Sequence, residues 1–157
     1  TVSAAQRMRL NVSGVDVSGA VLPGDLLPSL RIGEDGPLVE AIQLLLQQHG
    51  QDVVVDGDFG GQTDGAVRQF QRSNGLVVDG VVGSQTWSAL FVTVEMGDQG
   101  EAVSAVQTLL NARGQDVAID GDFGDQTRGA VRAFQRTNGL VVDGIVGPQT
   151  WSALVGG

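Results

Sequence analysis

Apolar residues recur at helical spacing from the Gly36-Pro37 pair onward. Proline suits the first position of a helix, because the amide proton that it lacks has no partner there. Glycine at position 50 supplies the left-handed residue that commonly ends a helix. The pattern therefore predicts an amphipathic helix that begins at Pro37 and ends before Gly50. Its stripe consists of Leu38, Ile42, Leu45, Leu46 and His49.

Two extended apolar runs follow, at residues 53–60 and 76–83, and an Asp-Gly pair interrupts each. Asp-Gly is a strong signal for a tight turn. A helix with Ala66, Val67 and Phe70 on one face separates the runs, and a short helix of sequence SQTWSAL follows the second. We expect the two runs to pair as a minimal two-stranded ribbon. That pairing would place both Asp-Gly loops and both following helix N-termini near one end of the fold.

The whole pattern occurs a second time further along the chain, at a constant offset and without a gap. About 40 of the 60 positions from 31 to 90 are identical to their counterparts at 95–154, which is far above chance for an internal repeat. The predicted fold class is mainly α, with two tandem compact three-helix units that each contain Asp-Gly turns. We place the units at residues 31–93 and 94–157. Residues 1–30 are interpreted as an N-terminal leader or linker with a short strand from Met8 to Val17.

Charge and composition narrow the classes of partner. The chain of 157 residues has a net charge of −9, and all nine of its basic residues are arginine. So acidic a chain lacks the basic footprint for nucleic acid or an anionic membrane surface, and no apolar run approaches the roughly 20 residues of a membrane span. With one histidine and no cysteine, a zinc site of the Cys/His type cannot be assembled. We expect no cofactor, no metal, no nucleic acid and no membrane insertion.

The residues shared by the two units resemble a known family. In the first unit they read D-G-x-F-G-x-x-T-x-x-A-V-x-x-F-Q-x-x-x-G-L-x-x-D-G-x-V-G-x-x-T-W-x-x-L from Asp56 to Leu90, and the second unit repeats this from Asp120 to Leu154. The pattern closely resembles that of the peptidoglycan-binding domain 1 family. Gln43 and Leu46 are also similar to residues of the family's first helix. The resemblance covers residues 31–157.

The resemblance implies a compact three-helix fold and a bacterial, secreted, cell-wall-associated protein. Its partner would be peptidoglycan or muropeptides, bound without catalysis by two weak sites whose tandem arrangement adds avidity. One alternative is a targeting fragment of a cell-wall hydrolase or transpeptidase, with that enzyme attached or associated. Another is a protein-interaction or pro-domain helical bundle. No catalytic residues are evident, so we predict that the chain is not an enzyme.

The aspartates and the histidine have simple structural interpretations. The Asp of each Asp-Gly pair is a turn former that accepts hydrogen bonds from its own backbone. A calcium loop is the weaker alternative, because the DGDFG spacing lacks the terminal Glu of an EF-hand. His49 corresponds to Arg113 in the second unit, so we expect both at partly exposed helix ends, where a cation suits the helix dipole.

The aromatic and arginine residues leave two interpretations open. Trp87 and Trp151 either stack on a sugar face or fill the core, and burial is the simpler. Phe59 and Phe123 follow a turn, and we expect them to be half exposed at the rim of a groove. Arginines on the second helix of each unit either bind stem-peptide carboxylates or form a solvated face. They are Arg68, Arg72, Arg128, Arg132 and Arg136.

Helix N-termini with nearby Gln and Thr side chains suit a ligand of amides, hydroxyls and carboxylates. Thr63, Thr86, Thr127 and Thr150 fall at the third position of predicted helices, where a side chain can reach back to the N-cap amide. We predict ligand contacts from residues that are fixed between the units. The candidates are Phe59, Gln62, Thr63, Gln85, Thr86 and Trp87 in the first unit and Phe123, Gln126, Thr127, Gln149, Thr150 and Trp151 in the second.

Overall fold

The computed structural model describes residues 27–156, and these form six α-helices. The first three are α1 (Pro37–Gln48), α2 (Gly61–Ser73) and α3 (Ser84–Leu90). Their counterparts are α4 (Glu101–Ala112), α5 (Asp125–Thr137) and α6 (Pro148–Gly156). The mainly α fold with two sets of three helices is confirmed. We call α1–α3 the first unit and α4–α6 the second unit. The strand expected from Met8 to Val17 lies outside the described residues.

The helix ends follow the glycines that the sequence places there. Gly36 precedes α1 with φ 114°, and Gly50 follows it with φ 90°. Only glycine adopts such backbone angles without strain. Gly75, after α2, has φ 69°, and the amide of Leu76 bonds to the Gln71 carbonyl at 2.9 Å. These contacts satisfy carbonyls that would otherwise be left open at the C-terminus of the helix.

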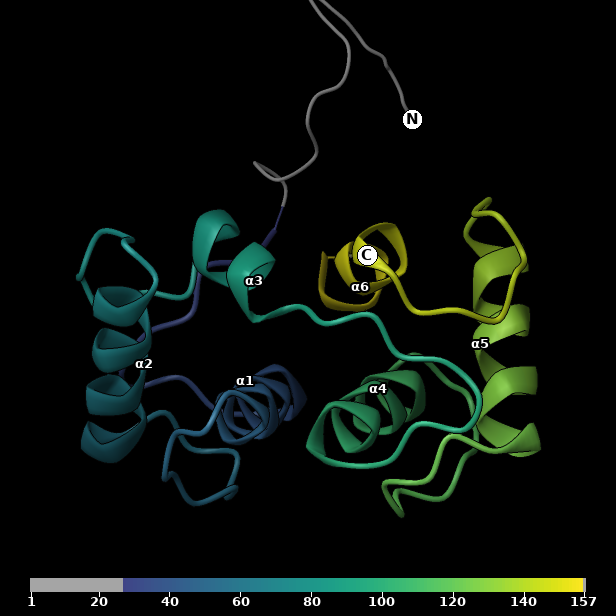
Figure 1. The fold of residues 1–157 in the computed structure, drawn as a ribbon, viewed down its shortest axis with the longest axis horizontal. Coiled ribbons are helices and arrows are strands. Elements are labelled where there is room, and N and C mark those ends of the chain that lie inside the picture. The colour runs from purple at the N-terminus through teal and green to yellow at the C-terminus, as the bar shows by residue number, and fades with distance from the viewer. Residues whose placement is uncertain (1–26, 157) are drawn as a thin grey trace, which may run out of the picture.

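The two units lie side by side (Figure 1). Helices α1 and α4 pack against each other at the centre, and they make the most extensive helix–helix contact among the described residues. Helices α2 and α5 stand at the two outer ends, and α3 and α6 lie on the same side of the α1–α4 pair. The fold is therefore one body with a continuous interior.

The expected ribbon does not form. Residues 53–60 and 76–83 do not pair with each other within the described chain, where only isolated bridges occur. Asp58 pairs instead with Asp35, and Val82 pairs with Leu30. Both partners lie upstream of α1, outside the two apolar runs. The two Asp-Gly loops are instead held by different helices, the first by Gln43 of α1 and the second by Gln71 of α2.

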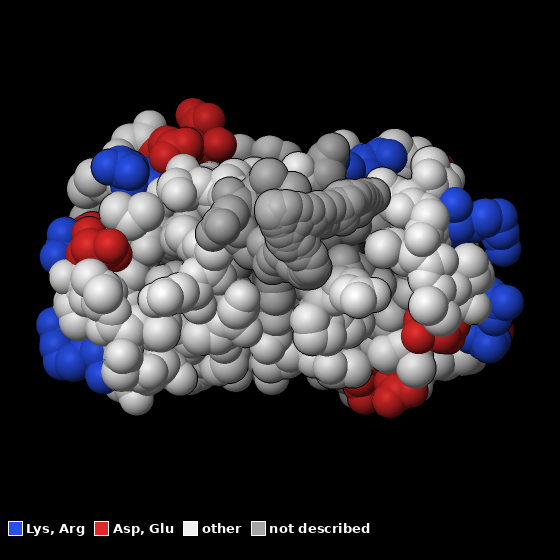
Figure 2. Space-filling model, turned by 90° about the horizontal axis from the view of Figure 1, so that it is seen from above, with Lys and Arg blue, Asp and Glu red and all other residues white. Residues whose placement is uncertain are grey.

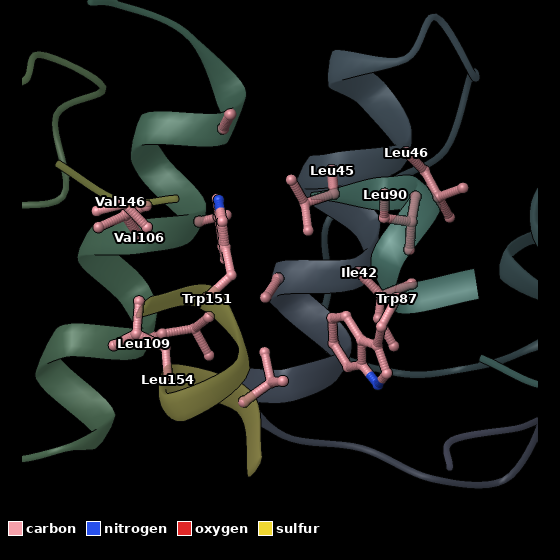
Figure 3. Packing of buried hydrophobic residues seen from close by; sticks show 14 of the residues in the cluster. Ile42, Leu45, Leu46, Trp87, Leu90, Val106, Leu109, Val146, Trp151 and Leu154 are labelled. Carbon is pink, nitrogen blue, oxygen red and sulfur yellow. The ribbon is translucent and has the colours of Figure 1, made fainter. Parts of the chain in front are cut away.

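One hydrophobic cluster extends through both units. Trp87 and Trp151 are fully buried in it, and Figure 3 shows them on opposite sides of the α1–α4 contact. The Trp87 indole N–H donates to the Pro28 carbonyl at 2.9 Å, and that of Trp151 donates to the Val92 carbonyl at 2.6 Å. Burial, the simpler of the two interpretations, is therefore correct, and each tryptophan anchors the segment that precedes its own unit.

Charged residues gather toward the ends of the molecule. In the face shown in Figure 2, arginine and acidic side chains lie toward the two ends of the long axis, and the described atoms visible between them are uncharged. The arginines include those of α2 and α5, the outermost helices. Among residues 27–156, the helices are too short or too polar to cross a bilayer.

Candidate functional site

A buried glutamine in α1 holds the first Asp-Gly loop. The Gln43 side chain is fully buried, and its Nε2 donates to Asp56 Oδ1 at 2.9 Å and to the Asp58 carbonyl at 3.1 Å. A third acceptor, Thr63 Oγ1, lies 3.0 Å from Nε2. Its Oε1 accepts from the backbone amides of Asp56 and Gly57, at 3.0 and 2.9 Å. One side chain thus satisfies five polar groups, which explains why an amide is tolerated in the core.

The second Asp-Gly loop is held in the same way by α2. Gln71 Nε2 lies 3.0 Å from Asp79 Oδ1 and 3.1 Å from Thr86 Oγ1. Its Oε1 accepts from the amides of Asp79 and Gly80. Gln107 and Gln135 repeat the two arrangements in the second unit. The molecule therefore contains four glutamine-held loops of one design.

The aspartates act as turn formers, as predicted. Asp56 Oδ1 accepts from the Asp58 amide at 3.0 Å, and Asp79 Oδ1 accepts from the Val81 amide at 2.9 Å. These backbone bonds are the largest cause of a lowered pKa at each carboxyl, and Asp120 and Asp143 behave alike. A lowered folded-state pKa stabilises the fold above the ordinary aspartate pKa, and this contribution is lost as the pH falls through the lowered value. Within residues 27–156, no group of three acidic or histidine side chains could hold a metal ion.

The threonines do not cap their own helices, contrary to the prediction. The Thr63 and Thr86 hydroxyls accept hydrogen bonds from Gln43 and Gln71. The amide of Gly60, the N-cap of α2, already donates to the Asp58 carbonyl at 3.0 Å. The loop therefore satisfies the cap amide that the threonine was expected to reach.

A groove lies between the second Asp-Gly loop and the start of the third helix in each unit. Its volume is about 410 Å³ in the second unit and about 340 Å³ in the first. Eight lining positions correspond between the units, and the first-unit lining adds Ser29 and Gln71. The second-unit lining includes Leu140, Val141, Asp143, Ile145, Pro148 and Gln149. Its first-unit counterparts are Leu76, Val77, Asp79, Val81, Ser84 and Gln85.

Valines on the second loop are the functional candidates that the sequence analysis missed. The side chains of Val77 and Val141 are 70% and 72% exposed, the two highest values among the exposed large hydrophobic residues. Both line the grooves. The available signal was the unchanged LVVDG segment, whose first valine has no core partner to explain its identity between the units.

The predicted ligand residues divide into three groups. Gln85 and Gln149 are exposed and line the grooves. Gln62 and Gln126 are exposed but lie on the helix after the first loop, where they accept from the amides of Val54 and Ala118. The remaining predicted residues are buried: Phe59, Thr63, Thr86, Trp87, Phe123, Thr127, Thr150 and Trp151. Thr86 and Thr150 reach the groove linings from beneath.

The expected half exposure of Phe59 and Phe123 was wrong. Each is 2% exposed. The Phe59 amide donates to the Glu34 carbonyl at 2.8 Å, and the Phe59 carbonyl accepts from the Gly33 amide at 2.9 Å. These bonds hold the loop against the segment before α1, so the ring packs into the core and does not lie at a groove rim.

His49 and Arg113 contact the third helix of their own unit. His49 Nε2 lies 2.9 Å from the Leu90 carbonyl, at the end of α3. Arg113 donates from Nε and Nη2 to the Leu154 carbonyl at 2.9 and 2.7 Å. Both residues follow the helix that carries them, as predicted, but each also satisfies a carbonyl near the end of another helix.

The arginines of α2 and α5 are arranged differently in the two units. Arg68 Nε lies 3.0 Å from Asp64 Oδ2, an i, i+4 ion pair. The residue equivalent to Asp64 in the second unit is Arg128. Helix α5 therefore has no counterpart of this pair, and its arginines form a row at i, i+4 and i+8. Surface pairs of this kind contribute little to stability.

Comparison with known proteins identifies the fold and its repeat. A family model described as "Putative peptidoglycan binding domain" matches twice, at residues 35–90 and 99–154. The chain is 38% identical over 109 residues to the N-acetylmuramoyl-L-alanine amidase CwlM of Mycobacterium tuberculosis, a match that covers 61% of this chain and 27% of that protein. It is 31% identical over 151 residues to a probable N-acetylmuramoyl-L-alanine amidase of Bacillus licheniformis, covering 77% of this chain and 43% of the relative.

Solved structures give similar matches. The N-terminal domain of SleB is 38% identical, with a TM-score of 0.40, over 41% of this chain and 89% of that one. The Burkholderia AP3 phage endolysin is 52% identical, with the same TM-score of 0.40, over 41% of this chain and 25% of that one. The chain spans half or less of the length of the curated relatives that it matches. The two family matches together cover most of the sequence. The chain therefore belongs to the peptidoglycan-binding domain family and contains two copies of the domain.

Proposed function

We propose that this chain is a non-catalytic module that holds peptidoglycan in its two equivalent grooves. The observation that carries the proposal is the occurrence of one groove, with corresponding linings, in both units. Each groove combines an exposed valine, an exposed glutamine and a rigid loop. A rigid wall with a few polar groups is typical of small-ligand sites.

The chemistry of the grooves suits an uncharged or weakly charged polymer. Gln85 and Gln149 have no side-chain hydrogen-bond partner among residues 27–156, so their amides remain available to ligand hydroxyl and amide groups. Val77 and Val141 offer apolar area to a methyl group or a sugar face. The described atoms between the two charged ends of the molecule are uncharged where Figure 2 shows them.

The test is sedimentation with insoluble sacculi. Wild-type protein is expected in the pellet, and the Val77→Glu/Val141→Glu double variant is expected to bind at least tenfold more weakly, because a buried carboxylate would oppose ligand contact. Val54→Glu is the matched control, since Val54 is an exposed valine of the first loop. It should bind like wild type. Wild-type protein that stays in the supernatant at every pH and salt concentration would refute the proposal.

A second candidate is the targeting part of a larger cell-wall hydrolase. The named curated relatives are amidases and a carboxypeptidase, and the chain spans only part of each. Under this candidate the binding role is unchanged, and an attached enzyme supplies the chemistry at the cell wall outside the cell. The complete reading frame decides between the two. Release of soluble fragments from sacculi by the present chain alone would contradict a non-catalytic role.

A further inference from the structure

Helices α1 and α4 run antiparallel across the contact between the units. Gln48, the last residue of α1, places Oε1 3.1 Å from the amide of Ala102, the second residue of α4. The C-terminus of one helix thus lies against the N-terminus of its counterpart. Two units related by simple translation would have these helices parallel.

The core shows the same relation. In Figure 3, Leu45, Trp87 and Leu90 each lie diagonally opposite their counterparts Leu109, Trp151 and Leu154 across the contact. In Figure 1, the outer helices α2 and α5 lie at opposite ends, while the third helices lie on one common side. Two units built of L-amino acids cannot be mirror images of each other, so the operation that relates them in this arrangement is a half-turn. The repeat therefore carries an internal twofold axis between α1 and α4.

The axis is fixed by the connector between the units. Phe91 stacks between the two tryptophans, with ring centroids 5.9 Å from Trp87 and 5.4 Å from Trp151. The plane of its ring is inclined by 28° and 9° to theirs. The hydrophobic cluster is continuous across this point. The units therefore do not turn freely against each other, and the relative direction of the two grooves is set by the fold.

A twofold axis reverses any direction perpendicular to it. The line that joins two equivalent points, here the two grooves, is always perpendicular to that axis. A straight strand running from one groove to the other would therefore enter the second in the opposite chemical direction. Glycan strands and peptides both have direction, so one strand cannot make the same contacts in both grooves.

We infer that the protein binds two separate strands of the wall polymer, one in each groove, and bridges them. The inference rests on the proposed function of the grooves and adds to it the number of bound strands. The module then links neighbouring strands of the polymer, and one strand does not gain affinity from both units. Each groove contributes independently to binding of a single strand.

The experiment uses soluble glycan strands that carry stem peptides but no cross-links and are long enough to span the molecule. Stoichiometry is measured by analytical ultracentrifugation. Energy transfer is measured in a mixture of donor-labelled and acceptor-labelled strands. We expect two strands per protein and energy transfer between them. Val77→Glu and Val141→Glu, made singly, should each leave one strand bound, lower energy transfer at least tenfold and change the affinity for the remaining strand less than twofold.

The contrary results are distinct. One strand per protein, with affinity at least tenfold lower in either single variant, would mean that one strand occupies both grooves. That result overturns the inference and leaves the proposed function standing. Absence of binding to strands and sacculi alike would overturn the proposed function as well. Val54→Glu is the control in each arm, and circular dichroism of every variant verifies that the fold is intact.

Discussion

The first and second units use equivalent helix ends differently. Gln48 accepts from an amide at the start of α4, whereas its counterpart Ala112 has no polar side chain to offer α1. At the next position His49 and Arg113 differ in chemistry yet both meet a carbonyl near the end of the third helix. The four glutamines that hold the loops, in contrast, are the same residue type at equivalent places. A single carbonyl near a helix end accepts from either of two different donors, whereas a loop with five fixed polar groups is held by glutamine in both units.

The largest expected effect comes from removing a loop-holding glutamine. Gln43→Leu leaves the amides of Asp56 and Gly57 without their acceptor, and we expect a loss of roughly 3 kcal/mol or more in the free energy of unfolding. Gln107→Leu should cost the same in the second unit. Urea denaturation measures both. Gln69→Ala, which gives an exposed α2 position the residue found at 133, is the control and should stay within about 0.5 kcal/mol. Unequal losses would show that the two units differ in their cores as well as on their surfaces.

The next effect tests the contact between the units. Phe91→Ala removes a half-buried ring that stacks on both tryptophans, and we expect a loss of about 2 kcal/mol. Because this ring joins the units, a single urea transition should separate into two. Phe91→Leu keeps apolar volume and should retain one transition. A single transition in Phe91→Ala would mean that α1 and α4 alone couple the units.

The difference between Gln48 and Ala112 predicts a smaller and reciprocal pair of effects. Gln48→Ala should cost about 1 kcal/mol, as the loss of a helix N-terminal acceptor generally does. Ala112→Gln should stabilise by up to about 1 kcal/mol, because the internal twofold axis brings position 112 to the amide of Leu38. Thermal unfolding of each variant measures these values. No gain from Ala112→Gln would indicate that the axis is only approximate at this end.

The smallest effect belongs to the ion pair present in one unit only. Asp64→Ala should cost less than about 0.5 kcal/mol, because Arg68 and Asp64 are both partly exposed and solvent screens their interaction. The loss should shrink further at high salt. Arg128→Ala, at the equivalent position of α5, is the comparison and should be close to neutral. A cost above about 1 kcal/mol for Asp64→Ala, beyond the range of exposed pairs, would assign this aspartate a role in the second loop.

Local patterns in the sequence were sufficient to predict the helices and turns. Gly36-Pro37 and Gly50 enclose α1 within one residue of the predicted bounds. The Asp-Gly turns and the burial of Trp87 also followed from residue type. These features depend on contacts within a few residues, or on the scarcity of large apolar side chains in so small a unit.

The features that failed depend on partners distant in sequence. The expected ribbon assumed that the two apolar runs pair, but Leu30 and Asp35 pair with them instead. The position of Phe59 follows from that pairing. The role of Gln43 could not be predicted because glutamine is usually exposed, and its five partners come together only when α1 crosses the loop. In the grooves, Gln85 was predicted and Val77 was not, because its only signal was the unchanged LVVDG segment, and an apolar run that enters the core would show the same identity between the units.

The tryptophan anchor bears on how the tandem arose. Each unit carries, in its own third helix, the indole N–H that binds the chain segment entering that unit. Copying one whole repeat in frame therefore copies both the donor and the segment that it holds, Pro28 in one case and Val92 in the other. The added copy needs no newly evolved acceptor for its entry segment. Duplication of the gene segment could thus yield a joined, stably folded pair in a single genetic event.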